Sequence, residues 1–274
     1  MKGKVYIVGA GPGDPELLTL KALRVLGLAD VVLHDDLVPP AILERVSPAA
    51  SIFNVGKRCG RKFTSQAEIN SLLVTYAAAG LTVVRLQGGD PLVFGRAGEE
   101  IRVLREAGAD FEIIPGVTAA TTAAAAVGIS LTERHVASKV ILMTGHHCAG
   151  RIEKASGENR IAPVDGAKLT APASGSNANQ NSTFVVYMPS DFAAVAAELR
   201  DTGLNATTPC LIVSAASTSE EQTYFTTLAE LPDAPSLPSP KVLIVGEAVG
   251  IKPDARDLSA EPKHASFQSL ADTR

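Results

Sequence analysis

The order of short apolar runs along the first 115 residues constrains the fold of this chain more than any other feature. Candidate strands lie at 5–8, 31–33, 52–55, 83–86 and 111–114. Helical patterns separate them, at 17–28, 65–79 and 97–107. Strands that alternate with helices need crossover connections, which place neighbouring strands parallel to one another. The sequence therefore predicts an α/β domain with a mostly parallel sheet.

Pro115-Gly116 interrupts this alternation, and we place a domain boundary there. Residues 1–115 form the predicted N-terminal domain and residues 116–250 a smaller C-terminal α/β domain. Within the second domain we expect helices at 118–127 and 192–199 and strands at 140–144, 184–188, 211–214 and 242–245. Polar composition predicts a flexible insert at 149–182 and a poorly ordered tail at 251–274.

Composition excludes several classes of function. A formal net charge of −4 argues against a general nucleic-acid binder, whose affinity depends on neutralising phosphates. Three widely spaced cysteines without a CxxC pair favour a reducing cytoplasm over a disulfide framework. The sequence shows neither a signal-peptide pattern nor an apolar run near the roughly 20 residues that cross a bilayer. We therefore expect a cytoplasmic protein without membrane or nucleic-acid partners.

A glycine-rich stretch at 88–100 follows the fourth candidate strand and predicts a ligand-facing loop. Gly88 and Gly89 allow close approach of the backbone to a bound molecule, and Asp90 adds a carboxylate at the same point.

The turn at 9–15 resembles a dinucleotide-binding turn, although its spacing is GxGxG. Pro12 removes a backbone donor from that turn. A tight strand-to-helix turn explains it equally well.

Two polar clusters also suggest ligand contacts. Residues 56–62 contain four cations within six positions, which fits either a polyanionic ligand or a solvated surface turn. Asp35 ends the second candidate strand, where open α/β sheets bind ligands, although a capping role is as probable on this pattern alone. His146-His147-Cys148 lacks a second cluster at ligand spacing, so we expect no metal site.

These motifs occur together, in one order, in a known family. They are VGAGPGDP (8–15), HDDLV (34–38), VGKRCG (55–60), Gln66-x-x-Ile69-Asn70, GGDPLVFGRAGEE (88–100), PGVTAA (115–120) and VVYMP (185–189). The chain thus resembles the tetrapyrrole methylase family from Val5 to about Gly246. The resemblance implies two α/β domains, a C-terminal mixed sheet, S-adenosylmethionine in the cleft between the domains, and a homodimer. The implied reaction methylates uroporphyrinogen III at C2 and C7 to give precorrin-2, for siroheme or cobalamin synthesis.

The resemblance also assigns roles to residues. Asp35 matches a proposed proton acceptor and Lys57 a proposed proton donor. The positions that match cofactor contacts are Pro12, Gly88, Gly89, Asp90, Val93, Thr118, Ala119, Met188 and Ser217. Arg58 and Arg96 are candidates for binding acceptor carboxylates, on charge grounds, because this acceptor carries eight carboxylates.

The chain departs from the family pattern at His34, Glu133 and Ser217, where tyrosine, histidine, and glycine or alanine are usual. Three alternatives stay open. A later precorrin methyltransferase would share the fold and cofactor, and a regulatory protein would bind tetrapyrroles without catalysis. A nicotinamide oxidoreductase would rest on the first glycine turn alone.

Overall fold

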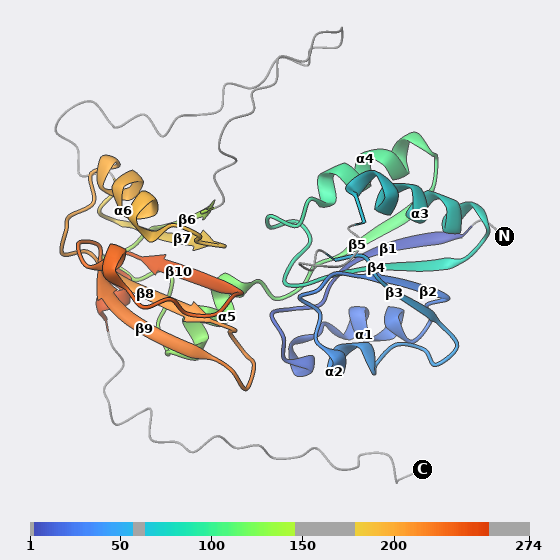
Figure 1. The fold of residues 1–274 in the computed structure, drawn as a ribbon, viewed down its shortest axis with the longest axis horizontal. Helices are drawn as coiled ribbons and strands as arrows, with labels where there is room; N and C mark the ends of the chain where they lie inside the picture. The colour runs from blue at the N-terminus through green and yellow to red at the C-terminus, as the bar shows by residue number, and fades with distance from the viewer. Residues whose placement is uncertain (1–2, 57–63, 146–178, 252–274) are drawn as a thin grey trace, which may run out of the picture.

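The computed structural model describes residues 3–56, 64–145 and 179–251, which form two five-stranded sheets (Figure 1). Of the strands in the described residues, the first sheet contains those before residue 115, and the second contains those after it. The predicted fold class is confirmed, because the first sheet is parallel and the second is mixed. The division into domains at Pro115 stays a prediction.

All neighbouring strands of the first sheet run parallel, in the order β3-β2-β4-β1-β5. The strands are β1 (Lys4–Gly9), β2 (Val31–His34), β3 (Ser51–Asn54), β4 (Thr82–Gln87) and β5 (Asp110–Ile114). Because parallel strands share a direction, all five carboxyl ends lie at one edge of the sheet. Loops that follow the strands, including the glycine-rich stretch at 88–100, therefore gather at that edge.

Helices cover both faces of the first sheet (Figure 1). On one face lie α1 (Leu20–Leu26) and the short α2 (Pro40–Leu43), packed over Val84 and Leu86 of β4. On the other face lie α3 (Gln66–Ala78) and α4 (Ala97–Glu106). Burial on both faces explains why these strands read as continuous apolar runs. A capping box begins α3, since Ser65 and Glu68 exchange hydrogen bonds.

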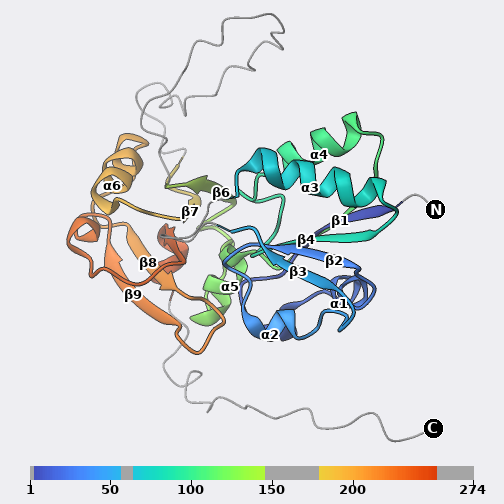
Figure 2. The same ribbon diagram turned by 45° about the vertical axis from the view of Figure 1, so that its right-hand side comes forward.

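The second sheet has the order β6-β7-β10-β8-β9. Its parallel pair, β6 with β7, lies side by side in Figure 2. Its strands are β6 (Lys139–Thr144), β7 (Ser182–Tyr187), β8 (Pro209–Ser214), β9 (Gln222–Thr227) and β10 (Lys241–Val245). The helix α5 (Ala119–Ala126) packs on one face, and α6 (Phe192–Asp201) packs on the other. Small side chains on α5 allow its close packing over the sheet.

Local structure differs from expectation at a few points. The helix expected from Leu17 begins later: a 3₁₀ turn at Pro15–Leu17 precedes α1, which Thr19 caps. The edge strand β9 was not expected, because its polar threonines and exposed outer face lack an apolar run. Residues 149–178 of the expected insert lie outside the described residues, whereas Ser182 already begins β7 and is buried.

A buried ion pair joins β4 to α4. Arg85 donates from Nε to Oε1 of Glu100 at 3.0 Å, and the two side chains are 7% and 0% exposed. Nη1 of Arg85 also donates to the carbonyl oxygens of Leu33 and Leu86. Buried charges are tolerated where their hydrogen bonds are satisfied, and removal of one partner leaves the other charge uncompensated.

Replacement of Glu100 by alanine should therefore lower the free energy of unfolding by about 3–5 kcal/mol. Glu99→Ala is the matched control, because Glu99 lies on the same helix and pairs with Arg96 at the surface. That change should cost less than about 1 kcal/mol. Urea denaturation of both variants measures the difference, and similar losses would contradict the structural role of the buried pair.

Candidate functional site

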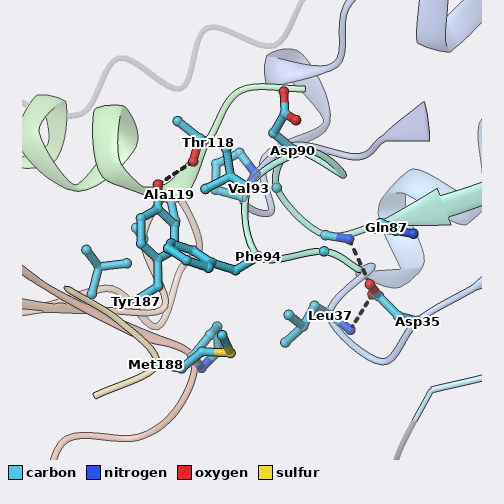
Figure 3. A pocket seen from close by; sticks show the side chains of 18 of the residues that line it. Asp35, Leu37, Gln87, Asp90, Val93, Phe94, Thr118, Ala119, Tyr187 and Met188 are labelled. Carbon is cyan, nitrogen blue, oxygen red and sulfur yellow. Dashed lines mark hydrogen bonds between the residues drawn. The ribbon is translucent and has the colours of Figure 1, made fainter. Parts of the chain in front are cut away.

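A cavity of about 270 Å³ lies between the carboxyl edge of the first sheet and the second sheet (Figure 3). The first sheet contributes the residues after β1, β2 and β4, among them Gly11, Asp35 and Gly88. The second sheet contributes Tyr187 and Val242, among others. The cavity thus occupies the position at which parallel α/β sheets bind ligands.

Two glycine turns form one side of the cavity. The amide of Gly89 donates to the carbonyl of Gly11 at 2.7 Å, and the amide of Gly11 donates back at 3.2 Å. Gly89 has φ = 70°, a conformation that side chains disfavour, and a Cβ placed there would meet nothing within 4 Å. The open space beside Gly89 leaves its backbone accessible to a bound molecule.

Asp35 connects the ends of β2 and β4. Its Oδ1 accepts from the amide of Leu37 at 3.0 Å, and its Oδ2 accepts from the amide of Gly88 at 3.0 Å (Figure 3). His34 is buried, and its Nδ1 lies 2.8 Å from the carbonyl oxygen of Asp35. The Asp35 carboxylate is therefore fixed at the cavity wall, and each oxygen has a second lone pair for another donor.

Asp90 holds the loop after β4 in place. Its Oδ1 accepts from the amide of Leu92 at 2.7 Å, and its Oδ2 accepts from the amide of Gly116 at 3.1 Å. The second bond links this loop to the segment that leaves the first sheet after β5. Asp90 thus shapes the cavity through the backbone.

Side chains of the second sheet and of the loop at 91–96 close the opposite wall. The hydroxyl of Tyr187 lies 2.5 Å from Oγ1 of Thr118 and accepts from the amide of Ala120 at 3.3 Å. The ring of Phe94 packs against the ring of Tyr187, with centroids 5.1 Å apart (Figure 3). Met188, 47% exposed, follows β7 with φ = 52°. This wall is apolar, with hydroxyl groups at one end.

Buried polar groups form a further part of the lining. Glu100 accepts from Nε2 of Gln87 through Oε2 at 2.9 Å and from Nε2 of Gln66 through Oε1 at 3.1 Å, besides its pairing with Arg85. Arg85 and Gln87 both line the cavity, although each is over nine-tenths buried. A guanidinium group is thus held in a fixed orientation at the cavity by a carboxylate behind it.

The structure brings most of the site residues predicted from the sequence together around this cavity. Those that line it are Pro12, Asp35, Gly88, Gly89, Asp90, Val93, Arg96, Thr118, Ala119 and Met188. Ser217 does not line it, whereas the neighbouring Ala216 does. Lys57 and Arg58 lie outside the described residues. The roles given to all these residues stay predictions.

Arg96 lies at the cavity with its charge already paired. Its Nε and Nη2 donate to the two carboxylate oxygens of Glu99 at 2.7 and 2.8 Å. These hydrogen bonds raise the pKa of the Arg96 guanidinium above its ordinary value. The Arg96 side chain is 50% exposed, so a ligand carboxylate can reach its guanidinium group. That carboxylate would either displace Glu99 or share the guanidinium group with it.

Several cavity residues were not predicted from the sequence, chiefly Arg85, Gln87, Leu37, Phe94 and Tyr187. Arg85 carried a signal, since a charged residue inside an apolar strand run needs a buried partner or a functional reason. Leu37 and Phe94 carried none, because single apolar residues in loops are common on protein surfaces.

The geometry disfavours a pyrophosphate cradle at the first glycine turn. The amides of Ala10, Gly11 and Asp14 already donate to Gln87, Gly89 and Ser217 respectively. Pro12 has no amide hydrogen to offer. A 3₁₀ turn follows, in place of the α-helix whose N-terminus binds the phosphates in dinucleotide-binding folds. These contacts argue against the hypothesis that this turn binds a nicotinamide dinucleotide.

Within 3–56, 64–145 and 179–251, no group of three or more histidine, cysteine, aspartate or glutamate side chains is placed to hold a metal ion. His146-His147-Cys148 lies outside these ranges. None of the helices in this part of the chain has the length and apolar character to cross a membrane.

Two similar proteins of known name cover most of this chain. A uroporphyrinogen III methyltransferase of Arabidopsis thaliana, named S-adenosyl-L-methionine-dependent and chloroplastic, is 43% identical over 92% of this chain and 65% of its own length. A siroheme synthase of Yersinia enterocolitica is also 43% identical, over 91% of this chain and 50% of its own length. The chain thus spans between half and two thirds of these two relatives.

Among solved structures, a uroporphyrin-III C-methyltransferase of Thermus thermophilus has a TM-score of 0.73 and 36% identity, and the match covers 94% of this chain and 100% of that one. The Thermus enzyme complexed with S-adenosylhomocysteine has a TM-score of 0.67 and 35% identity, over 90% and 93% of the two chains. A cobalt precorrin-4 methyltransferase has a TM-score of 0.72 and 30% identity, over 90% and 95%.

The family model for tetrapyrrole (corrin/porphyrin) methylases matches residues 4–232, a range that includes the whole first sheet and the cavity residues from Gly11 to Ala216. Together with the relatives above, this match shows that the chain belongs to the tetrapyrrole methylases.

Proposed function

We propose that this protein transfers methyl groups from S-adenosylmethionine to C2 and C7 of uroporphyrinogen III and so forms precorrin-2. The observation that carries the proposal is the cavity between the sheets, where the family's glycine turn and Asp35 meet. Relatives named for this reaction, and a structural neighbour complexed with S-adenosylhomocysteine, support it. The product would serve siroheme or cobalamin synthesis.

The methyl donor would bind against the glycine turns and the wall of the second sheet. Gly89 leaves space where a side chain would otherwise stand, and its φ of 70° is a conformation that residues with a side chain disfavour. Thr118, Ala119 and Met188 face the same cavity with hydroxyl, methyl and thioether groups. This combination suits a donor that has polar groups and apolar carbon surface around a positively charged sulfonium centre.

The acceptor would bind nearer the ends of β2 and β4. Uroporphyrinogen III has eight carboxylates around an apolar ring system, so its site needs cations beside apolar surface. Arg85 and Arg96 supply guanidinium groups at the cavity, while Leu37 and Phe94 supply apolar surface. The cations at 57–62, including Lys57 and Arg58, follow β3 in the sequence and are proposed to join this group.

S-adenosylmethionine supplies an electrophilic methyl group, and a pyrrole carbon of the acceptor takes it as the new C–C bond forms and the C–S bond breaks. The protein contributes mainly by holding both molecules in line. Asp35 is fixed by two amides and retains lone pairs that can accept the proton released from the acceptor. Lys57 is the proposed proton donor. A homodimer in the cytoplasm stays a prediction.

Anaerobic incubation with S-adenosylmethionine and uroporphyrinogen III tests the proposal directly. We expect mass spectrometry to detect a product that carries two added methyl groups, together with S-adenosylhomocysteine. Binding of the donor without transfer would contradict the proposal and favour a regulatory tetrapyrrole-binding protein. Transfer to a precorrin but not to uroporphyrinogen III would favour a later methyltransferase.

Replacement of Asp35 by asparagine should reduce turnover by roughly 10²–10⁴-fold, because the proton acceptor is lost. Binding of S-adenosylhomocysteine, measured by calorimetry, should change little. Asp30→Asn is the matched control, since Asp30 also accepts a backbone amide, from Thr82 at 2.7 Å, at the opposite edge of the sheet. Unaltered turnover in Asp35→Asn, or an equal loss in the control, would refute the role of Asp35.

A further inference from the structure

A hydrogen bond joins the first glycine turn to a loop of the second sheet. The amide of Asp14 donates to Oγ of Ser217 at 3.2 Å, across 203 positions of sequence. Pro12, two residues before Asp14, and Ala216, one residue before Ser217, both line the cavity. The bond therefore lies just behind the point where the two sheets meet at the cavity margin.

Ser217 is held rigidly in an unfavourable conformation. Its φ is 64°, a left-handed value that a residue with a Cβ disfavours. Its amide donates to Oε2 of Glu221 at 2.7 Å, so a carboxylate from the same loop fixes the backbone. Strained backbone persists where its surroundings hold it in place, and such positions gather at ligand sites.

The turn and the loop also pack closely. A Cβ on Gly13 would lie 2.7 Å from Cγ2 of Thr218 and 3.6 Å from Oγ of Ser217, so no side chain fits between the two segments. Asp14 caps the following 3₁₀ turn with its side chain, through the amide of Glu16, which leaves its own amide to Ser217. Backbone and side chain of Asp14 thus act on different partners.

The loop at 91–96, which follows β4, also contacts the second sheet, because the ring of Phe94 packs on Tyr187 of β7. That contact is apolar and does not involve the first glycine turn. Loss of the Ser217 hydroxyl would therefore release the Asp14 end of the turn, while Gly11 stays bonded to Gly89 and the sheets stay in contact through Phe94 and Tyr187. We therefore expect the hydroxyl to affect the position of Pro12 more than the packing of the two sheets against each other.

We propose that Ser217 is a positioning residue for the methyl donor, because its hydroxyl holds the turn at 11–14 against the second sheet. The inference rests on the proposed function, since it assigns the donor to the cleft that this turn borders. Ser217 does not itself need to touch the donor. Through Asp14 it fixes the distance between Pro12 and Ala216, and so the width of the cleft.

Ser217→Gly tests the role without adding strain, because glycine adopts the left-handed conformation freely. Ala215→Gly is the matched control: Ala215 belongs to the same loop and has φ = 48°, but its side chain bonds nothing across the cleft. We expect Ser217→Gly to weaken binding of S-adenosylhomocysteine about three- to tenfold, the value of one hydrogen bond. Turnover at saturating donor and the KM for uroporphyrinogen III should stay close to their original values.

Amide exchange measured by NMR reports on the bond itself. In the ligand-free protein, the amide hydrogen of Asp14 should exchange several-fold faster in Ser217→Gly than in Ala215→Gly. Equal exchange rates would overturn the inference, as would equal donor affinities in the two variants. Failure of the unaltered protein to bind S-adenosylhomocysteine would instead contradict the proposed function, and with it the positioning role.

Discussion

Close contact among three glycines determines how the rest of the site is arranged. A Cβ on Gly116 would lie 2.3 Å from the carbonyl oxygen of Gly89 and 2.9 Å from Cα of Gly9. These residues follow or end β5, β4 and β1, three neighbouring strands of the first sheet. Because no side chain separates these glycines, the backbone segments that follow the three strands lie in direct contact. Asp90 then ties two of these segments together through the amide of Gly116.

Charge in this protein is distributed unevenly. The chain has a net negative charge, yet guanidinium groups from Arg85 and Arg96 reach the cavity. Each is paired with a glutamate of α4, Glu100 inside and Glu99 outside. One helix therefore orients both arginines, and its position relative to β4 sets where positive charge is offered to a ligand. The electrostatics of the site therefore depend on the packing of α4 beside β4.

Much of the first half could be predicted from the sequence, because buried parallel strands and amphipathic helices leave regular apolar patterns. The glycine turns and Asp35 were recognised as a site since they follow strands whose ends must share one edge. Tyr187 and Phe94 could not be found this way, because their contact joins segments far apart in sequence. The edge strand β9 was not predicted because it is largely exposed, so its sequence lacks the apolar run of a buried strand.

The contrast between the two arginine pairs has a consequence for the response to salt. Dissolved ions screen charges at the surface but act weakly on buried ones. The orientation of Arg85 by Glu100 is therefore insensitive to ionic strength, whereas the exposed pair of Arg96 and Glu99 weakens as salt rises. The cavity thus keeps one guanidinium of constant geometry beside another whose availability to an anion varies with the medium.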